Sequence, residues 1–180
     1  MKQILLFALF AFSLFSQSPV NKGAKGLSGQ VLYNSTSSMS DHSSLLDISP
    51  AGFCFVSGQL ELGLSLTWQR YWEDEVTVTT AGAGPYVNLY LMKEGQVLPY
   101  IGAGFNFLER TMTVDNSYIR NYNQTSILRE LNLSLGLLVP ISNSVSLTPM
   151  LHHKWYWQNK DSFGDYKEFM IGVGLKTFLN

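Results

Sequence analysis

The sequence contains few charged residues for its length. Only 14% of its 180 residues are Asp, Glu, Lys or Arg, whereas 46% are hydrophobic. Typical soluble domains carry roughly 25% charged residues, so this chain has too few charges for a water-exposed surface of ordinary size. The formal net charge is −1, with no basic cluster. Nucleic acid is therefore not an expected partner, since a basic patch is the usual electrostatic footprint of such binding.

Cysteine is almost absent, and no long apolar run follows the N-terminal segment. Cys54 is the only cysteine, so the chain cannot form an internal disulfide. A small exported domain without disulfides must gain its stability in another way. Beyond residue 17 no apolar stretch approaches the ~20 residues that a transmembrane helix requires. Such stability can come from closing a β-sheet into a barrel inside a bilayer, because a barrel pairs every backbone group and leaves no open edge.

The N-terminus has the features of a secretory signal peptide. Lys2 supplies a positive charge, and residues 4–15 are almost entirely apolar. That length fits the hydrophobic region of a signal peptide and is too short to span a bilayer as a helix. We predict a cleaved signal peptide over residues 1–17, a polar lead-in over 18–25 and a single β-barrel domain over 26–180.

Most of the remaining chain alternates between apolar residues and small or polar ones. Leucine occupies every second position over residues 60–66 and 131–137, and apolar residues do so over 169–175. A period of two is typical of a β-strand with one apolar face. Turn residues divide the chain into eight such segments, which we expect to be strands: 26–34, 45–56, 59–71, 76–92, 97–114, 127–141, 145–158 and 167–179.

The connections between these segments alternate in character. Three are tight turns, at 57–58, 93–96 and 142–144. The others are polar loops, of which the third is the longest: 35–44, 73–75, 115–126 and 159–166. An even number of strands, joined alternately by short turns and longer loops, is typical of bacterial outer-membrane barrels. We therefore predict an all-β fold, a single eight-stranded antiparallel up-and-down transmembrane β-barrel.

The chemistry of the two strand faces predicts which face points outward. One face combines glycines with polar and charged residues: Glu61, Gln69, Asn88, Asn106, Arg110, Glu130, Asn132, Lys154, Glu168 and Lys176. A dry soluble core could not bury so many polar groups cheaply, whereas the narrow lumen of a membrane barrel has room for small residues and a hydrogen-bonded network. The other face is apolar: Leu60, Leu62, Leu64, Leu66, Val87, Leu89, Leu91, Ile101, Phe105, Phe107, Leu131 to Val139, Leu147, Leu151, Ile171, Val173 and Leu175.

Aromatic residues near the loop ends fit the same orientation. Trp68, Trp72, Trp155 and Trp157 lie close to predicted loops, as in the aromatic belt at a membrane interface. Arg129 falls on the apolar face near this rim, where an arginine costs only roughly 0–1 kcal/mol. The second segment has no clear apolar face, so its orientation stays open, and a bulge or proline there could shift its phase.

Several short motifs resemble those of a known family. Residues 48–55, followed by 60–63, resemble the Ser-Pro-x-x-Gly-aromatic hairpin of small outer-membrane β-barrel proteins. Residues 85–90 and 98–105 resemble the next hairpin of that family, and the resemblance spans about 26–180. The family includes OmpX-like and OmpW-like barrels and the porin-like outer-membrane β-barrel domain. The resemblance implies an outer-membrane location and assembly by the barrel-insertion machinery, but no particular chemistry.

Few residues suggest catalysis or metal binding. His152 and His153 are adjacent on a predicted strand and therefore point to opposite faces, so they cannot jointly hold a metal. His42 beside Ser43 in the first loop resembles a lipid-A deacylase barrel, but a nucleophile also needs an oriented base. Cys54 is interpreted as a small packing residue. We expect no enzymatic activity, no cofactor, no metal site and no catalytic or binding residues.

The favoured function is a non-catalytic integral protein of the Gram-negative outer membrane, with a structural, surface-contact or adhesion role. Its expected partners are outer-membrane lipid including lipopolysaccharide, the barrel-assembly machinery and a surface partner bound by the 115–126 loop with Tyr118, Arg120 and Tyr122. Three alternatives remain open: a narrow channel or binding barrel for small hydrophobic solutes, a lipid-modifying enzyme, and a soluble exported barrel.

Overall fold

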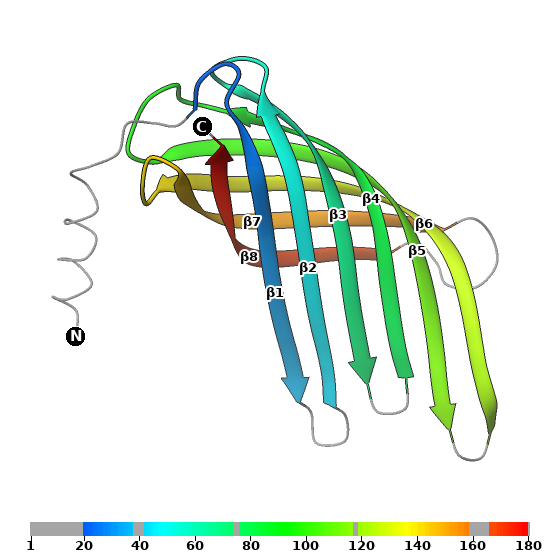
Figure 1. Ribbon diagram of the computed structural model, residues 1–180. Helices are drawn as coiled ribbons and strands as arrows, with labels where there is room; N and C mark the ends of the chain where they lie inside the picture. Colours follow the sequence, from blue (N-terminus) through cyan, green and yellow to red (C-terminus); the bar gives the residue numbers. More distant parts are fainter. Residues whose placement is uncertain (1–19, 38–41, 74–75, 117–118, 159–165, 180) are drawn as a thin grey trace, which may run out of the picture.

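The computed structural model describes residues 20–37, 42–73, 76–116, 119–158 and 166–179, but not the side chains of 33–37, 42, 115–116, 119–123, 158 and 166. Across these residues the chain forms a closed antiparallel barrel in which each strand pairs with its sequence neighbours and the last with the first (Figure 1). The eight strands are β1 (Lys25–Ser37), β2 (His42–Phe55), β3 (Leu60–Glu73), β4 (Val76–Tyr90), β5 (Leu98–Asn116), β6 (Ile119–Pro140), β7 (Val145–Gln158) and β8 (Tyr166–Leu179). The predicted number, direction and order of the strands are confirmed.

Two of the predicted loops are largely strand. The segment 115–126 was expected to be the longest loop, but β5 continues to Asn116 and β6 starts at Ile119. The backbones pair across this region, with Val114 opposite Tyr122. The first predicted loop, 35–44, is shortened in the same way. The prediction was wrong because a strand ladder needs only backbone partners, so strands continue into polar sequence where the apolar alternation has ended.

The strands differ in how far they extend toward the loops. We call the end of the barrel that carries the connections after β2, β4 and β6 the turn end, and the opposite end the loop end. Pairing between β1 and β8 stops at Val31, and pairing between β6 and β7 begins at Leu128. Beyond these points β1 to β6 run on past β7 and β8 (Figure 1). The barrel is therefore closed by all eight strands only over its turn-end part.

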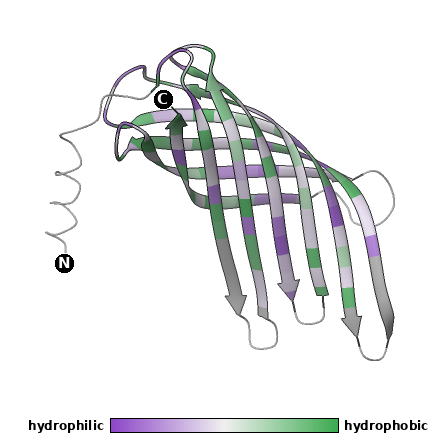
Figure 2. Ribbon diagram, viewed as in Figure 1, coloured by the Kyte–Doolittle hydropathy of each residue, from purple (hydrophilic) through white to green (hydrophobic). Residues whose placement is uncertain are grey.

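The facing of the strands agrees with the predicted orientation. Outward leucines and isoleucines are strongly exposed, with Leu64 at 68% and Ile171 at 71%, whereas Glu61 and Glu130 on the inner face are 0% exposed. Figure 2 shows the resulting mixture of hydrophobic and hydrophilic positions along each strand of the wall. Leu138 departs from the predicted outer face, because it points inward and is fully buried.

The orientation of β2 is resolved by its pairing with β3. Ile48 lies opposite Trp68 and Ala51 opposite Ser65, so the register is the same on both sides of Pro50. The suggested phase shift at this proline is therefore wrong. Asp47, Phe53 and Phe55 face the lumen and are buried, whereas Ile48, Pro50 and Cys54 are exposed on the outer wall.

Glycines line the lumen where the wall is crowded. A Cβ atom added at Gly84 would come within 1.9 Å of the Phe105 carbonyl oxygen, and one at Gly136 within 2.5 Å of the Tyr100 ring. Small residues on the inner face thus leave space for the large polar side chains beside them. In the part of the chain that the structure describes, no helix is long and apolar enough to cross a membrane.

Candidate functional site in the barrel lumen

An apolar cluster fills the turn end of the lumen. We call it the turn-end plug, and its buried members are Val20, Phe53, Phe55, Tyr90, Leu98, Tyr100, Leu138 and Phe178. Its rings pack closely, with centroids 5.3 Å apart between Phe53 and Phe178 and 5.2 Å between Phe55 and Tyr90. The lead-in therefore contributes more than polar residues, because Val20 is 3% exposed in this cluster.

A fully hydrogen-bonded carboxylate lies next to the plug. Glu61 accepts hydrogen bonds from Tyr86 Oη at 3.0 Å, Asn88 Nδ2 at 3.1 Å and Tyr90 Oη at 2.8 Å. Lys176 Nζ donates at 2.5 Å to Glu61 Oε2, the oxygen that Tyr90 also bonds, and lies 4.5 Å from the centre of the Phe53 ring. We call this group the Glu61 cluster. Its single carboxylate and single ammonium balance one another.

A second charged group lies farther toward the loop end. Lys154 Nζ donates to Asp47 Oδ2 at 3.2 Å and lies 3.8 Å from Glu130 Oε2. Asp47 also accepts from Gln69 Nε2 at 2.8 Å and from Ser49 Oγ at 2.7 Å. We call this group, with Asn106, the Lys154 cluster. It contains two carboxylates and one ammonium, and each of these three charged residues is at most 2% exposed.

Glu130 is the least satisfied member of the Lys154 cluster. Its Oε1 accepts a hydrogen bond from Asn106 Nδ2 at 2.7 Å. Its Oε2 is buried and accepts no hydrogen bond from the described residues, so the ammonium at 3.8 Å is its main electrostatic compensation. A buried carboxylate oxygen in this position is costly unless the opposite charge stays in place.

His152 on β7 contacts polar side chains of β6 and β1 inside the lumen. Its Nδ1 lies 3.1 Å from Asn132 Oδ1 and its Nε2 lies 3.0 Å from Gln30 Oε1, so both ring nitrogens have polar neighbours. His153 points outward, with its ring centroid 4.1 Å from that of Trp155. The predicted opposite facing of the two histidines is confirmed, and within the described residues no group of His, Cys, Asp and Glu could hold a metal ion.

A cavity of about 110 Å³ lies among these polar side chains. Its walls include Ser28, Ser65, Asn132, Thr148 and His152. Pockets for drug-sized ligands are typically about 300–1,000 Å³, so this cavity has room for water molecules rather than for a solute. A hydrated, hydrogen-bonded interior explains how the barrel can hold several buried charges.

An apolar layer lies on the loop-end side of the Lys154 cluster. Leu108, Leu128 and Tyr156 are each at most 2% exposed and form a buried cluster. On β5, β6 and β7 they occupy the next inward positions after Asn106, Glu130 and Lys154. Beyond them opens a second cavity of about 220 Å³, lined by Tyr71, Val78, Arg110, Met112, Gln124 and Ser126.

The lumen brings together every polar residue that the sequence assigned to the inner face, but it also contains residues that the sequence did not assign. Asp47 was missed because the facing of β2 was open, although Phe53 and Phe55 share its face. Gln30, Tyr86 and Tyr90 were missed because single polar or aromatic residues on a strand carry no signal of their own. His152 was considered only as a metal ligand.

The other predicted positions lie outside the lumen or outside the described residues. Cys54 is exposed on the outer wall, so its interpretation as a packing residue was wrong. Its facing follows from the β2 register, which the sequence did not define. Ser43 is paired with Glu73 on β3, while the side chains of His42, Tyr118, Arg120 and Tyr122 are not described.

The comparisons with known proteins concern the fold. No protein-family profile matches the sequence, and no curated protein matches it. The N-terminal β-barrel domain of Pseudomonas aeruginosa OprF superimposes with a TM-score of 0.55 at 16% identity, covering 88% of this chain and 98% of that domain. Neisserial surface protein A (NspA) superimposes with a TM-score of 0.59 at 14% identity, covering 90% of this chain and 98% of NspA. This chain therefore has the eight-stranded barrel fold of small outer-membrane β-barrel proteins.

Proposed function

We propose that this protein is an integral, non-catalytic barrel of the Gram-negative outer membrane, exported through a cleaved signal peptide. One observation carries the proposal: the wall exposes rows of large apolar side chains, while five charged residues are buried inside, namely Asp47, Glu61, Glu130, Lys154 and Lys176. In water this arrangement would expose a large apolar surface. In a bilayer the same rows contact lipid, and the closed sheet leaves no unpaired edge. The lipid of that membrane, including lipopolysaccharide, and the barrel-assembly machinery are the partners that this location requires.

Migration on gels tests this placement. The folded chain in the membrane fraction should migrate differently before and after boiling, as a barrel resistant to detergent does. Leu64→Arg, in the middle of the outer face, should cost roughly 2–4 kcal/mol of stability in lipid, whereas Ile127→Arg near the rim should cost roughly 0–1. Full solubility of the mature chain without detergent would contradict the proposal.

We further propose that its role is structural or surface contact rather than transport. The turn-end plug and the two charged clusters support this, because they occupy the lumen of a barrel whose eight strands leave little internal space. The β5–β6 hairpin is the candidate contact surface, since its strands of 19 and 22 residues exceed the ~9–11 residues needed to cross the hydrocarbon. This hairpin contains the 115–126 segment.

Electrical recordings separate this role from its main alternative, a narrow channel or binding barrel for small hydrophobic solutes. The purified barrel should give no steady conductance in a planar bilayer. An epitope tag placed between residues 116 and 119 should be accessible to antibody on intact cells. Regular single-channel steps would favour the channel instead, and an inaccessible tag would remove the hairpin as a surface for contact.

The loop-end cavity is the observation that favours the binding alternative. Its lining combines apolar side chains with Arg110 and Tyr71, a mixture that suits an amphipathic molecule. Its volume of about 220 Å³ lies below the range of pockets for drug-sized ligands, so such a molecule would have to be smaller than these. Saturable binding of such a solute, lost in Met112→Trp and kept in an outward control such as Thr111→Val, would support it.

A further inference from the structure

Two cations stand on the outer wall at the border of its apolar band. Arg129 on β6 and Lys167 on β8 are both exposed. Among the side chains that the structure describes, neither has a hydrogen-bond or ion-pair partner. Glu109 on β5 lies diagonal to Arg129, because it pairs with Ile127, yet no ion pair joins the two residues.

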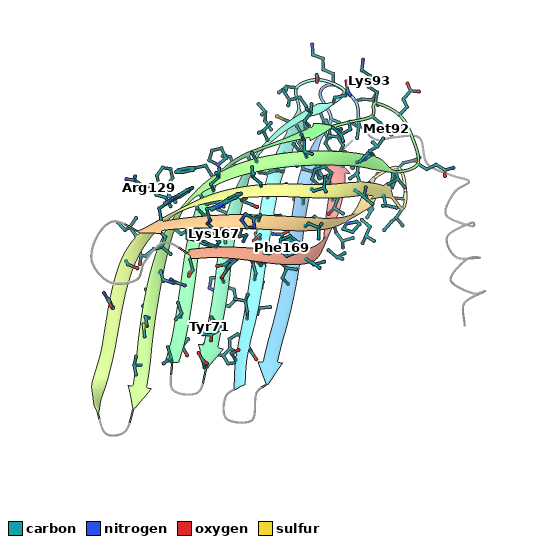
Figure 3. All side chains as sticks on the ribbon, turned by 180° about the vertical axis from the view of Figure 1, so that it is seen from behind. Tyr71, Met92, Lys93, Arg129, Lys167 and Phe169 are labelled. Atoms are coloured by element: carbon teal, nitrogen blue, oxygen red, sulfur yellow. The ribbon has the colours of Figure 1, made fainter. Side chains whose placement is uncertain are left out.

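The strand register places both cations around a pair of tryptophans. Arg129 lies opposite Trp157, and Lys167 lies opposite Trp155. With strands ~4.8 Å apart and a rise of ~3.4 Å per residue, the two Cα atoms are about 12 Å apart. Their long side chains can therefore converge over the tryptophans. Figure 3 shows Arg129 and Lys167 on this part of the wall, with Phe169 following along β8.

The surface that runs from these cations toward the turn end is apolar except for His153, which lies opposite Leu133 and Phe169 on the same outer wall. Phe169 is 64% exposed, Ile171 71% and Leu133 44%. A patch in which cations and tryptophans border an apolar surface matches a membrane lipid in shape and polarity. A membrane lipid presents its phosphorylated headgroup at the level of the cations and its acyl chains along the apolar rows.

We propose that Arg129, Lys167, Trp155 and Trp157 form a binding site for the phosphorylated headgroup of an outer-leaflet lipid. Arginine and lysine are the side chains that bind phosphate, the first through paired donors and the second as a point charge. The proposal rests on the proposed function, because it requires the apolar rows to face lipid. It adds a position for the lipid on one side of the barrel.

The opposite side of the wall supplies a matched control. Arg70 on β3 is also exposed and outward, between Trp68 and Trp72 on the same strand. Its partners on the neighbouring strands are Leu46 and Thr79, so no second cation stands beside it. General attraction between cations and an anionic bilayer would act on Arg70 as well, whereas a built site would depend on the pair.

Native mass spectrometry of the folded barrel in detergent tests the site. The probes are bisphosphorylated lipid A, the same lipid with its phosphates removed, and inorganic phosphate alone. We expect the wild-type barrel to retain the phosphorylated lipid and the Arg129→Gln/Lys167→Gln variant to bind it about 30-fold more weakly. Arg70→Gln should bind it as the wild type does. Heat-dependent gel migration confirms for each variant that the barrel has folded.

Three results would overturn the site. Equal weakening by Arg70→Gln would indicate unspecific attraction to the headgroups. Equal retention of the dephosphorylated lipid would show that the phosphate is not recognised. Displacement of the lipid by millimolar inorganic phosphate would show that the site takes a free anion rather than a lipid. In each case a folded barrel in the membrane fraction would leave the proposed function standing, whereas a chain that never forms such a barrel would remove both.

Discussion

Two buried lysines lie in the lumen, and their surroundings differ in charge. Lys176 faces one carboxylate, Glu61, which also receives three neutral donors. Lys154 has two carboxylates within 4 Å, Asp47 and Glu130, and one oxygen of the latter has no hydrogen bond among the described residues. The same residue types thus form a balanced cluster beside the plug and a cluster with one excess negative charge near the middle of the lumen.

The difference shows what each cluster depends on. Neutral donors can keep a buried carboxylate hydrogen-bonded when its cation is removed, although its charge remains uncompensated. In the Glu61 cluster three neutral donors serve one carboxylate. In the Lys154 cluster three neutral donors serve two carboxylates and leave one oxygen of Glu130 with only the ammonium beside it. The stability of the second cluster should therefore be more sensitive to loss of its lysine.

Replacement of Lys154 should have the largest effect. Lys154→Met keeps most of the side-chain volume but leaves Asp47 and Glu130 buried without a cation, and we expect a loss near the upper end of about 3–5 kcal/mol. The measurement is the urea midpoint of the barrel folded into lipid vesicles. Adding Glu130→Gln to this variant should restore part of the loss, and a midpoint equal to wild type would contradict the assigned role of the ammonium.

Replacement of Lys176 should cost less. Lys176→Met leaves one carboxylate, which keeps its bonds to Tyr86, Asn88 and Tyr90, so the expected loss is about 3 kcal/mol. The same vesicle assay compares it directly with Lys154→Met. If the order of the two variants were reversed, charge balance would not be what distinguishes the clusters.

Removal of one neutral donor should have a smaller effect. Tyr90→Phe deletes the hydroxyl that donates to Glu61 at 2.8 Å while leaving the ring in the plug, and we expect a loss of about 1.5–3 kcal/mol. Tyr100→Phe is the matched control, because that hydroxyl contacts Met150 Sδ at 3.9 Å and no carboxylate. Equal urea midpoints for the two variants would show that the hydroxyl does not stabilise Glu61.

Removal of the excess charge should have the smallest effect. Glu130→Gln in the wild-type background takes away one of two carboxylates beside one ammonium, so a change within about 1 kcal/mol is expected, since a neutral amide is cheaper to bury. The corresponding change in the balanced cluster, Glu61→Gln, should cost more because it leaves Lys176 without its counter-charge. A Glu130→Gln loss as large as that of Glu61→Gln would show that the excess charge carries no penalty.

The sequence predicted the type and facing of the strands better than their lengths. The leucines of 60–66 and 131–137 fixed both the strand type and the outer face, because a period of two leaves one arrangement in which they share a side. The segment 115–126 was predicted poorly because its Asn, Tyr and Arg residues belong to strands that extend past the apolar band. The backbone of such an extension pairs as in the rest of the strand, but its side chains lack the apolar alternation from which a strand is predicted.

The sequence predicted many of the residues that line the lumen but not which of them form pairs. Glu61, Glu130, Lys154 and Lys176 were assigned to the inner face from their alternation alone. That Lys176 reaches Glu61 and Lys154 reaches Asp47, residues 115 and 107 positions apart in the chain, follows only from closing the sheet. Local sequence contains no information on which inward residues meet across a barrel, since strand tilt and stagger determine that.

The sequence by itself determined that this chain forms an even number of antiparallel strands with an apolar outer face and a polar inner face, because side-chain alternation is a local property of each strand. The tertiary structure decided which charges pair, where β2 faces, how the plug fills the turn end and how two outward cations flank a pair of tryptophans. These features depend on register between strands, and register becomes fixed only when the whole sheet closes.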